Sequence, residues 1–326
     1  MSLLFDRFRE VRALVLGDLM LDEYVFGQAT RVSQEAPVLV IRQERTSAVP
    51  GGAANVATNM VALGAGVELL GVVGDDVPGR TLCETLAVTG VSAPRIIVDG
   101  TRPTTRKTRV LANHSHQVVR IDHETVRDAD EAVQDRILAA LEEGLEGCGV
   151  LLISDYRKGT VPKTLIARAI ELARSRGVAS CANAKPDSLE AYAGATLVTI
   201  NRFEASDVLK REHPIGDDEA EAVAVDLRAR LGVERLVITL GGSGMVCATE
   251  SGTVRVPAIR VEVYDEAGAG DTVVATLALC AATGETGVDA LRMAAHTAAA
   301  VVRKVGVAVP TESDLRDIER ALAQYP

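Results

Sequence analysis

Residues 265–278 read Asp-Glu-Ala-Gly-Ala-Gly-Asp-Thr-Val-Val-Ala-Thr-Leu-Ala, a glycine turn that runs into a small, apolar helix. Such a turn points backbone N–H groups outward at the positive end of the helix and so predicts an anion site. A carboxylate, Asp271, lies in the same turn, where it would repel a phosphate unless it takes a proton from an attacking hydroxyl. A base beside an anion cradle is what phosphoryl transfer to an alcohol requires. The alternative is a plain tight turn in which Asp271 caps the helix.

The composition favours an α/β protein that acts on small molecules. The chain has 326 residues, of which 47% are hydrophobic and only 3% aromatic, which fits aliphatic strands covered by Ala-rich helices. A net charge of −10 argues against binding to nucleic acid or to an anionic membrane. The five cysteines lack short paired spacings and are typical of reduced cytoplasmic thiols. We therefore expect a cytoplasmic protein without nucleic-acid or membrane partners.

Short apolar runs alternate with amphipathic stretches along most of the chain, as at 55–63 and 67–73. This βαβα order predicts a mostly parallel sheet with helices on both faces. Two stretches, about 23–43 and 101–121, are rich in Val, Thr and Arg and lack helical periodicity. They predict strands of a small antiparallel lid outside the main sheet, within a single domain that spans residues 1–326.

A second glycine motif, Gly51-Gly52-Ala53-Ala54-Asn55, precedes a predicted helix. The glycines let the backbone approach a ligand, and the Asn55 amide offers both a donor and an acceptor, which suits sugar hydroxyls. An Asn-assisted helix start without a ligand is the alternative. The chain contains no Walker loop and no G-x-G-x-x-G after its first strand, which disfavours P-loop and dinucleotide-binding proteins.

The two motifs together, in this order, resemble those of the ribokinase-like (PfkB) carbohydrate kinases. The resemblance runs from about Val11 to Pro310 and implies a three-layer αβα fold with a β lid, and ATP and Mg²⁺ as cofactors. It implies that Asp271 is the base and that the N–H groups of Gly268, Ala269 and Gly270 hold the transferring phosphoryl group. It implies further nucleotide-side residues: Lys185, Asn201, Glu204, Thr239, Gly241, Gly244 and His296. Asn201 and Glu204 would organise Mg²⁺ through water.

Within that family the chain is most similar to the heptose-phosphate kinases, which phosphorylate the anomeric hydroxyl of D-glycero-D-manno-heptose 7-phosphate on the route to lipopolysaccharide core. The similarity lies in residues 17–22, 33–38, 102–109 and 154–159. It implies a sugar hydroxyl oriented by Asp22, Gly51, Gly52 and Asn55. A phosphorylated sugar needs fixed cations, for which we select Lys107 and Arg109; the alternative for them is a solvated basic strand face. In this branch the kinase is often fused to a nucleotidyltransferase, and the chain would be the stand-alone form.

Four positions depart from the family pattern: Asn183, Glu266, Ala275 and His296. They leave open a kinase of the same fold for another sugar, sugar phosphate or nucleoside, and a non-catalytic sugar- or nucleotide-binding regulator. An additional carboxylate at Glu266 would repel phosphate if it faced the cradle. A monovalent cation such as K⁺ near Asp265 is a further expectation, and the lid edges suggest a homodimer.

Overall fold

The computed structural model describes residues 4–113 and 116–325. Its central sheet has the strand order β12-β11-β10-β9-β8-β7-β1-β3-β4, in which β10 through β4 run parallel and β11 and β12 are antiparallel additions. The predicted α/β fold with a mostly parallel sheet is confirmed. The strands are β1 (Arg12–Val32), β2 (Leu39–Gly52), β3 (Gly66–Val73), β4 (Ser92–Val98), β5 (Thr105–Ala112), β6 (His116–His123), β7 (Val150–Ser154), β8 (Ala179–Asn183), β9 (Leu197–Asn201), β10 (Arg235–Thr239), β11 (Met245–Thr249) and β12 (Gly252–Val256).

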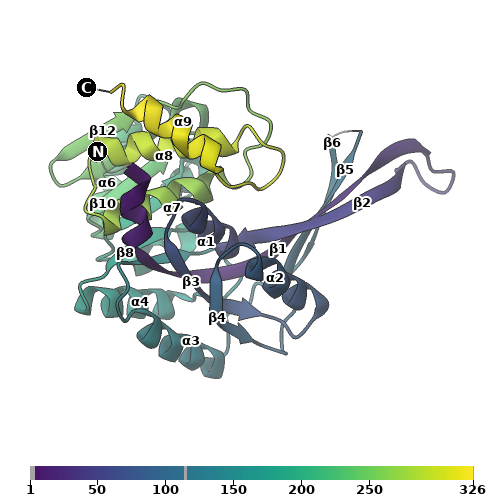
Figure 1. Cartoon of the computed structure of the whole chain (residues 1–326), viewed down its shortest axis with the longest axis horizontal. Helices are drawn as coiled ribbons and strands as arrows, with labels where there is room; N and C mark the ends of the chain where they lie inside the picture. The colour runs from purple at the N-terminus through teal and green to yellow at the C-terminus, as the bar shows by residue number, and fades with distance from the viewer. Residues whose placement is uncertain (1–3, 114–115, 326) are drawn as a thin grey trace.

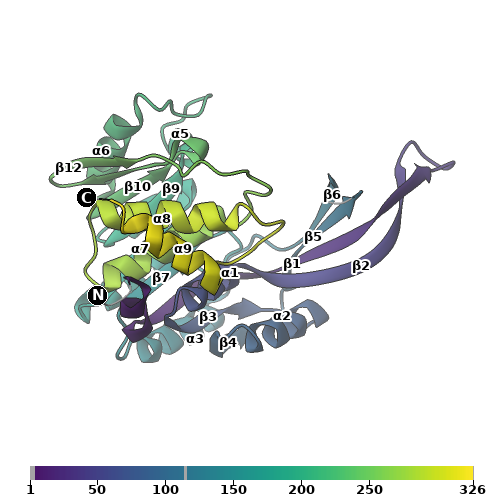
Figure 2. The ribbon, with the colours of Figure 1, turned by 45° about the horizontal axis from the view of Figure 1, so that its top comes forward.

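Helices cover both faces of this sheet (Figures 1 and 2), and alternate side chains of β1 enter two different cores. Ala13 and Val15 pack in one core, whereas Leu14 and Leu16 pack in the other, as expected for a strand buried on both faces. The first core contains residues of α1 (Ala53–Ala62), α2 (Val77–Ala87), α7 (Ala269–Ala282), α8 (Val288–Val301) and α9 (Glu312–Leu322). The second contains residues of α3 (Glu131–Gly144), α4 (Lys163–Ser175), α5 (Arg202–Val208) and α6 (Ala220–Leu231).

Strand β1 leaves the central sheet and continues into the lid, which projects from the αβα body together with β2, β5 and β6 (Figure 1). The β1–β2 and β5–β6 pairs are antiparallel, as expected. Strand β5, however, runs parallel to β1, from Met20↔Thr105 to Gly27↔Ala112, so the lid sheet is mixed. The reason is the long connection through β3, α2 and β4, which returns the chain to β1 in its original direction.

The carboxyl ends of the parallel strands meet at the base of the lid. Gly17 of β1 pairs with Ser154 at the end of β7, and Ser154 pairs with Asn183 at the end of β8. Ligands of open α/β sheets bind at this edge, where loops and helix N-termini gather. No helix among the described residues is long and apolar enough to cross a membrane.

Candidate active site

Asp271 lies in the first turn of α7, and only 5% of its surface is exposed. The Asn55 amide of α1 donates to Asp271 Oδ2 at 2.7 Å. The Tyr156 hydroxyl, from the loop after β7, donates to Asp271 Oδ1. The sequence motifs thus bring Asn55 and Asp271 into direct contact across 216 positions of the chain.

Burial raises the pKa of Asp271 to about 6, because removing the carboxylate from water disfavours its charged form. The hydrogen bonds from Tyr156 and Asn55 and the charge of Lys185 oppose this effect. Nearby Asp22 reinforces it through like-charge repulsion. A carboxyl group with a pKa in this range can accept a proton and still be ionised near neutral pH, as a general base must be.

The Asn55 amide is itself held by a buried polar chain that joins α1 to α7. Asn59 Nδ2 donates to Asn55 Oδ1 at 3.1 Å and to the Asn55 carbonyl at 2.9 Å. Thr272 Oγ1 donates to Asn59 Oδ1 at 2.8 Å. With its oxygen facing Asn59, the Asn55 amide presents its nitrogen to Asp271, so the orientation of the amide is fixed by its partners.

The turn before Asp271 forms an open N-terminus of the kind that the sequence predicts. Gly268, the N-cap, has a φ of 83°, a left-handed conformation that favours glycine. A Cβ at Gly270 would meet nothing within 4 Å, so the backbone there borders open space. Among the described carbonyl groups, none accepts a backbone hydrogen bond from Gly270 or Asp271. Glu266 is exposed to solvent, so its carboxylate is not buried against this turn.

The sugar-side candidates lie where β1, β2 and β5 meet. Asp22 is buried and forms an ion pair with Arg109. A Cβ at Gly51 would overlap the Asp22 carboxylate, so the first glycine of the motif is needed for this close approach. Gly52 has a φ of 58° and directly precedes α1, which carries Asn55. Arg109 is therefore already engaged by a carboxylate.

Lys107 and Lys158 form a second group of cations on this side. The pKa of Lys107 is lowered, first by burial and then by the like charge of Lys158. Lys158 Nζ contacts Glu124 Oε1 at 2.7 Å, whereas no described carboxylate forms an ion pair with Lys107. Lys107 Nζ lies 5.9 Å from the Tyr156 ring centroid. Two neighbouring ammonium groups that repel each other are an arrangement that an anion would stabilise.

Asn201 and Glu204 form a capping box at the start of α5. Asn201 Oδ1 accepts from the N–H groups of Phe203 and Glu204, both at 2.9 Å, and Glu204 Oε2 accepts from Asn201 N at 2.8 Å. Glu204 Oε1 contacts the ammonium group of Lys185, which lies 5.2 Å from the Tyr156 ring centroid. Lys185 thus joins the capping box to Tyr156, which donates to Asp271.

Three other nucleotide-side candidates, Thr239, Gly241 and Gly244, lie farther along the same edge. Thr239 ends β10, and Gly241 and Gly244 adopt φ values of 61° and 94° in the turn to β11. His296 lies on α8, and its ring contacts Tyr325 edge-on at 6.1 Å between centroids. Burial lowers the pKa of His296, which favours a neutral ring.

No group of three or more His, Cys, Asp or Glu side chains among residues 4–113 and 116–325 could hold a metal ion directly. Asp265, the expected neighbour of a monovalent cation, accepts hydrogen bonds from the backbone. Its Oδ1 accepts from Ala267 N at 2.9 Å, and its Oδ2 accepts from Gly306 N at 3.0 Å. It therefore ties the glycine turn to the segment after α8.

Sequence reasoning did not select Tyr156, Lys158, Asn59 or Asp18 as site residues. Tyr156 and Lys158 lie in one of the stretches that resemble the heptose-phosphate kinases, and Asp18 lies in another, so those stretches were an available signal. Asn59 follows Asn55 by one helical turn, the spacing that places two side chains on one face.

Comparisons with known proteins show which family the chain resembles. A family model described as pfkB family carbohydrate kinase matches residues 12–314. Proteins named bifunctional protein HldE from Rhodopseudomonas palustris (strain BisB5) and Azorhizobium caulinodans are each 40% identical, over 93% and 95% of this chain. The chain spans 62% and 65% of the length of these relatives.

Solved structures share the fold at lower identity. Phosphofructokinase-2 from Escherichia coli in complex with potassium has a TM-score of 0.79 and 20% identity, and the match covers 96% of this chain and 99% of that one. Arabidopsis thaliana ribokinase complexed with ribose and ATP has a TM-score of 0.73 and 18% identity, with 95% and 99% covered.

A buried carboxylate beside an open helix N-terminus, at the carboxyl edge of an αβα sheet, is the arrangement that phosphoryl transfer to an alcohol requires. The chain belongs to the pfkB family of carbohydrate kinases.

The pKa of Asp271 gives a prediction for the pH dependence of the reaction. If Asp271 is the base, it acts in its ionised form, so kcat/KM for the sugar should fall about tenfold per pH unit below about pH 6 and level off above it. The profile is measured at saturating ATP from about pH 5 to about pH 9. An acid limb near the ordinary aspartate pKa of about 4 would contradict the predicted effect of burial.

Proposed function

We propose that this kinase transfers the γ-phosphoryl group of ATP to the anomeric hydroxyl of D-glycero-D-manno-heptose 7-phosphate. The observation that carries the proposal is the position of Tyr156, which donates to Asp271 and also lies beside Lys107 on the lid. The base and a cation suited to a phosphorylated sugar thus lie against the same side chain. The heptose-kinase-like motifs and the 40% identity to proteins named HldE support this substrate.

In this mechanism Asp271 takes the proton of the sugar hydroxyl. The sugar oxygen bonds to the γ-phosphorus as the bond from that phosphorus to the β–γ bridging oxygen breaks, and the proton ends on the carboxylate. The N–H groups at Gly268–Gly270, with those of the first turn of α7, stabilise the charge on the phosphoryl oxygens. Asp22, Gly51, Gly52 and Asn55 border the sugar, and the lid excludes water that would otherwise hydrolyse ATP.

Lys185, Thr239, Gly241, Gly244 and His296 are proposed to line the nucleotide side. Mg²⁺, when bound, would neutralise phosphate charge there. Asn201 and Glu204 would contact Mg²⁺ through water rather than directly. Their side-chain oxygens already accept hydrogen bonds within the capping box or contact Lys185. Asp265 is proposed to help order a monovalent-cation site; a neighbour of the same fold, phosphofructokinase-2, was solved in complex with potassium.

Recognition of the sugar's own phosphate is assigned to Lys107, with Lys158 beside it. Arg109 also belongs to this side, but its guanidinium is engaged by Asp22, so its role would be to hold that carboxylate in place. An incoming phosphate relieves the repulsion between the two ammonium groups, which makes its binding more favourable.

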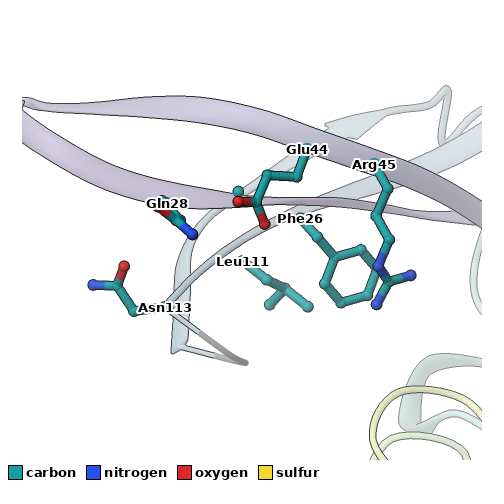
Figure 3. Close-up of a pocket in the computed structure, with 7 residues that line it drawn as sticks. Phe26, Gln28, Glu44, Arg45, Leu111 and Asn113 are labelled. Atoms are coloured by element: carbon teal, nitrogen blue, oxygen red, sulfur yellow. The ribbon is translucent and has the colours of Figure 1, made fainter.

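We also propose that the protein is cytoplasmic, that it uses ATP and that it forms a homodimer through the lid. Exposed apolar side chains gather on the lid strands and their connecting turn: Val32, Val38, Leu39, Val119 and Ile121. Between β1, β2 and β5 the lid also has a pocket, in which the Arg45 guanidinium lies 3.5 Å from the Phe26 ring centroid and Leu111 lies nearby (Figure 3). Apolar surface of this kind on a strand edge favours association with a second copy.

A charge on the lid should prevent this association. Ile121→Asp places a carboxylate at a position that is 56% exposed on β6, and the variant should sediment as a monomer where the unmodified protein sediments as a dimer. Val126→Asp, at a 68% exposed position outside the lid strands, is the control and should remain dimeric. A monomeric unmodified protein, or a dimeric Ile121→Asp variant, would contradict the proposed interface.

Removal of the Lys107 ammonium should weaken sugar binding selectively. Lys107→Ala should raise KM for heptose 7-phosphate more than tenfold, about 1.4 kcal/mol, and leave KM for ATP unchanged. A coupled assay of ADP release, run with heptose 7-phosphate, fructose 6-phosphate, ribose and adenosine in turn, also shows which acceptor is phosphorylated fastest.

Lys163→Ala, an exposed lysine at the start of α4, is the matched control and should leave both constants unchanged. If Lys107→Ala has the same KM for heptose 7-phosphate as the unmodified protein, Lys107 does not bind the phosphate of the sugar. Faster turnover of ribose or adenosine than of either sugar phosphate would overturn the proposed substrate class, and no ADP release with any acceptor would favour the non-catalytic regulator.

A further inference from the structure

Tyr156 and Asn55 contact different oxygens of the same carboxylate. Asn55 reaches Asp271 Oδ2 from α1, and Tyr156 reaches Asp271 Oδ1 from the loop after β7. Each carboxylate oxygen has two lone-pair sites, so these two hydrogen bonds leave room on each oxygen for a hydroxyl that approaches from another direction. The two donors together fix the plane of the carboxylate.

The loop that carries Tyr156 is anchored by Asp18, whose side chain is fully buried at the end of the core section of β1. Asp18 Oδ2 accepts from the backbone N–H groups of Tyr156 at 2.7 Å and Lys158 at 3.0 Å, and Oδ1 accepts from Thr160 at 3.0 Å. Between them, Arg157 adopts a φ of 60°, an uncommon conformation for a residue with a side chain. Three hydrogen bonds to one buried carboxylate hold this backbone and so fix the position from which the Tyr156 side chain extends.

We propose that Tyr156 is a positioning residue for the base, and that Asp18 places it through the 155–160 loop. The proposal rests on the proposed role of Asp271. Tyr156 holds the carboxylate in the orientation in which it meets the sugar hydroxyl, and its hydrogen bond favours the ionised form of Asp271. The phenol does not itself take the proton.

The charges around Tyr156 are consistent with its role as a hydrogen-bond donor to Asp271. Burial, followed by the charge of Asp271 and the hydrogen bond to it, raises the pKa of Tyr156 well above its ordinary value, and Asp22 and Glu204 act in the same direction. The phenol therefore stays neutral and keeps its proton for the carboxylate. Lys107 from the lid and Lys185 from the nucleotide side lie 5.9 Å and 5.2 Å from its ring centroid. The ring thus lies close to one cation from each side of the site.

The test is a titration of Asp271 in the unliganded protein, which needs no knowledge of the substrate. Protein labelled with ¹³C at the aspartate carboxyls is titrated by NMR, and the Asp271 resonance is assigned by its loss in Asp271→Asn. The unmodified protein should show a midpoint of about 6. Tyr156→Phe should shift this midpoint upward by about one pH unit, because a donor to the charged form is lost.

Kinetics supply the second readout. In Tyr156→Phe the acid limb of kcat/KM should move upward with the NMR midpoint, and kcat near pH 7 should fall about tenfold while KM for the sugar stays within about twofold. Tyr192→Phe is the matched control: it removes the hydroxyl of another buried tyrosine, which makes no described hydrogen bond to Asp271, and should change neither quantity.

An unchanged Asp271 midpoint in a folded Tyr156→Phe protein would overturn the proposal. Asp18→Asn should shift the midpoint in the same direction, since it weakens the anchor of the loop; an unchanged midpoint in that variant would overturn the role of Asp18. If the titration behaves as predicted but no sugar is phosphorylated, the positioning stands and the proposed function fails.

Discussion

The burial of one carboxylate at the start of α7 is the constraint around which the site is arranged. Water is removed from Asp271, which raises its pKa, while the helix N-terminus, two hydrogen-bond donors and Lys185 favour its charge. These opposing effects leave a group that is both basic enough to take a proton and ionised near neutral pH. Gly268 begins the helix, and the Asn59–Asn55 pair directs an amide nitrogen at the carboxylate.

Strand β1 connects this centre to the proposed sugar side. Its core section ends near Asp18, which anchors the Tyr156 loop, and its lid section, which begins near Met20, carries Asp22, which pairs with Arg109 of β5. A displacement of the lid would therefore act on the same strand that anchors the loop of Tyr156. This continuity gives the lid a physical route to Asp271 through β1, and it favours a site that is completed when the lid covers the sugar.

Much of the fold and part of the site follow from the sequence, because they depend on local patterns. The alternation of apolar runs gave the parallel sheet, and the two glycine motifs marked Asp271 and Asn55. Contacts between side chains far apart in the chain do not follow from such patterns. The ion pair of Arg109 with Asp22 and the hydrogen bond of Tyr156 to Asp271 span 87 and 115 positions and depend on strand register and loop path. The parallel pairing of β5 with β1 was missed for the same reason, since alternation within a strand does not specify the direction of its neighbour.

The most direct measurement of the central claim is the turnover of Asp271→Asn with ATP and heptose 7-phosphate, alongside the affinity of the variant for ATP. The substitution keeps the shape of the side chain and removes its ability to take a proton. If Asp271 is the base, kcat should fall by about 10³-fold while ATP binds with unchanged affinity. A kcat within about tenfold of the unmodified protein would contradict the assignment of Asp271 as the base, because general-base catalysis contributes more than that.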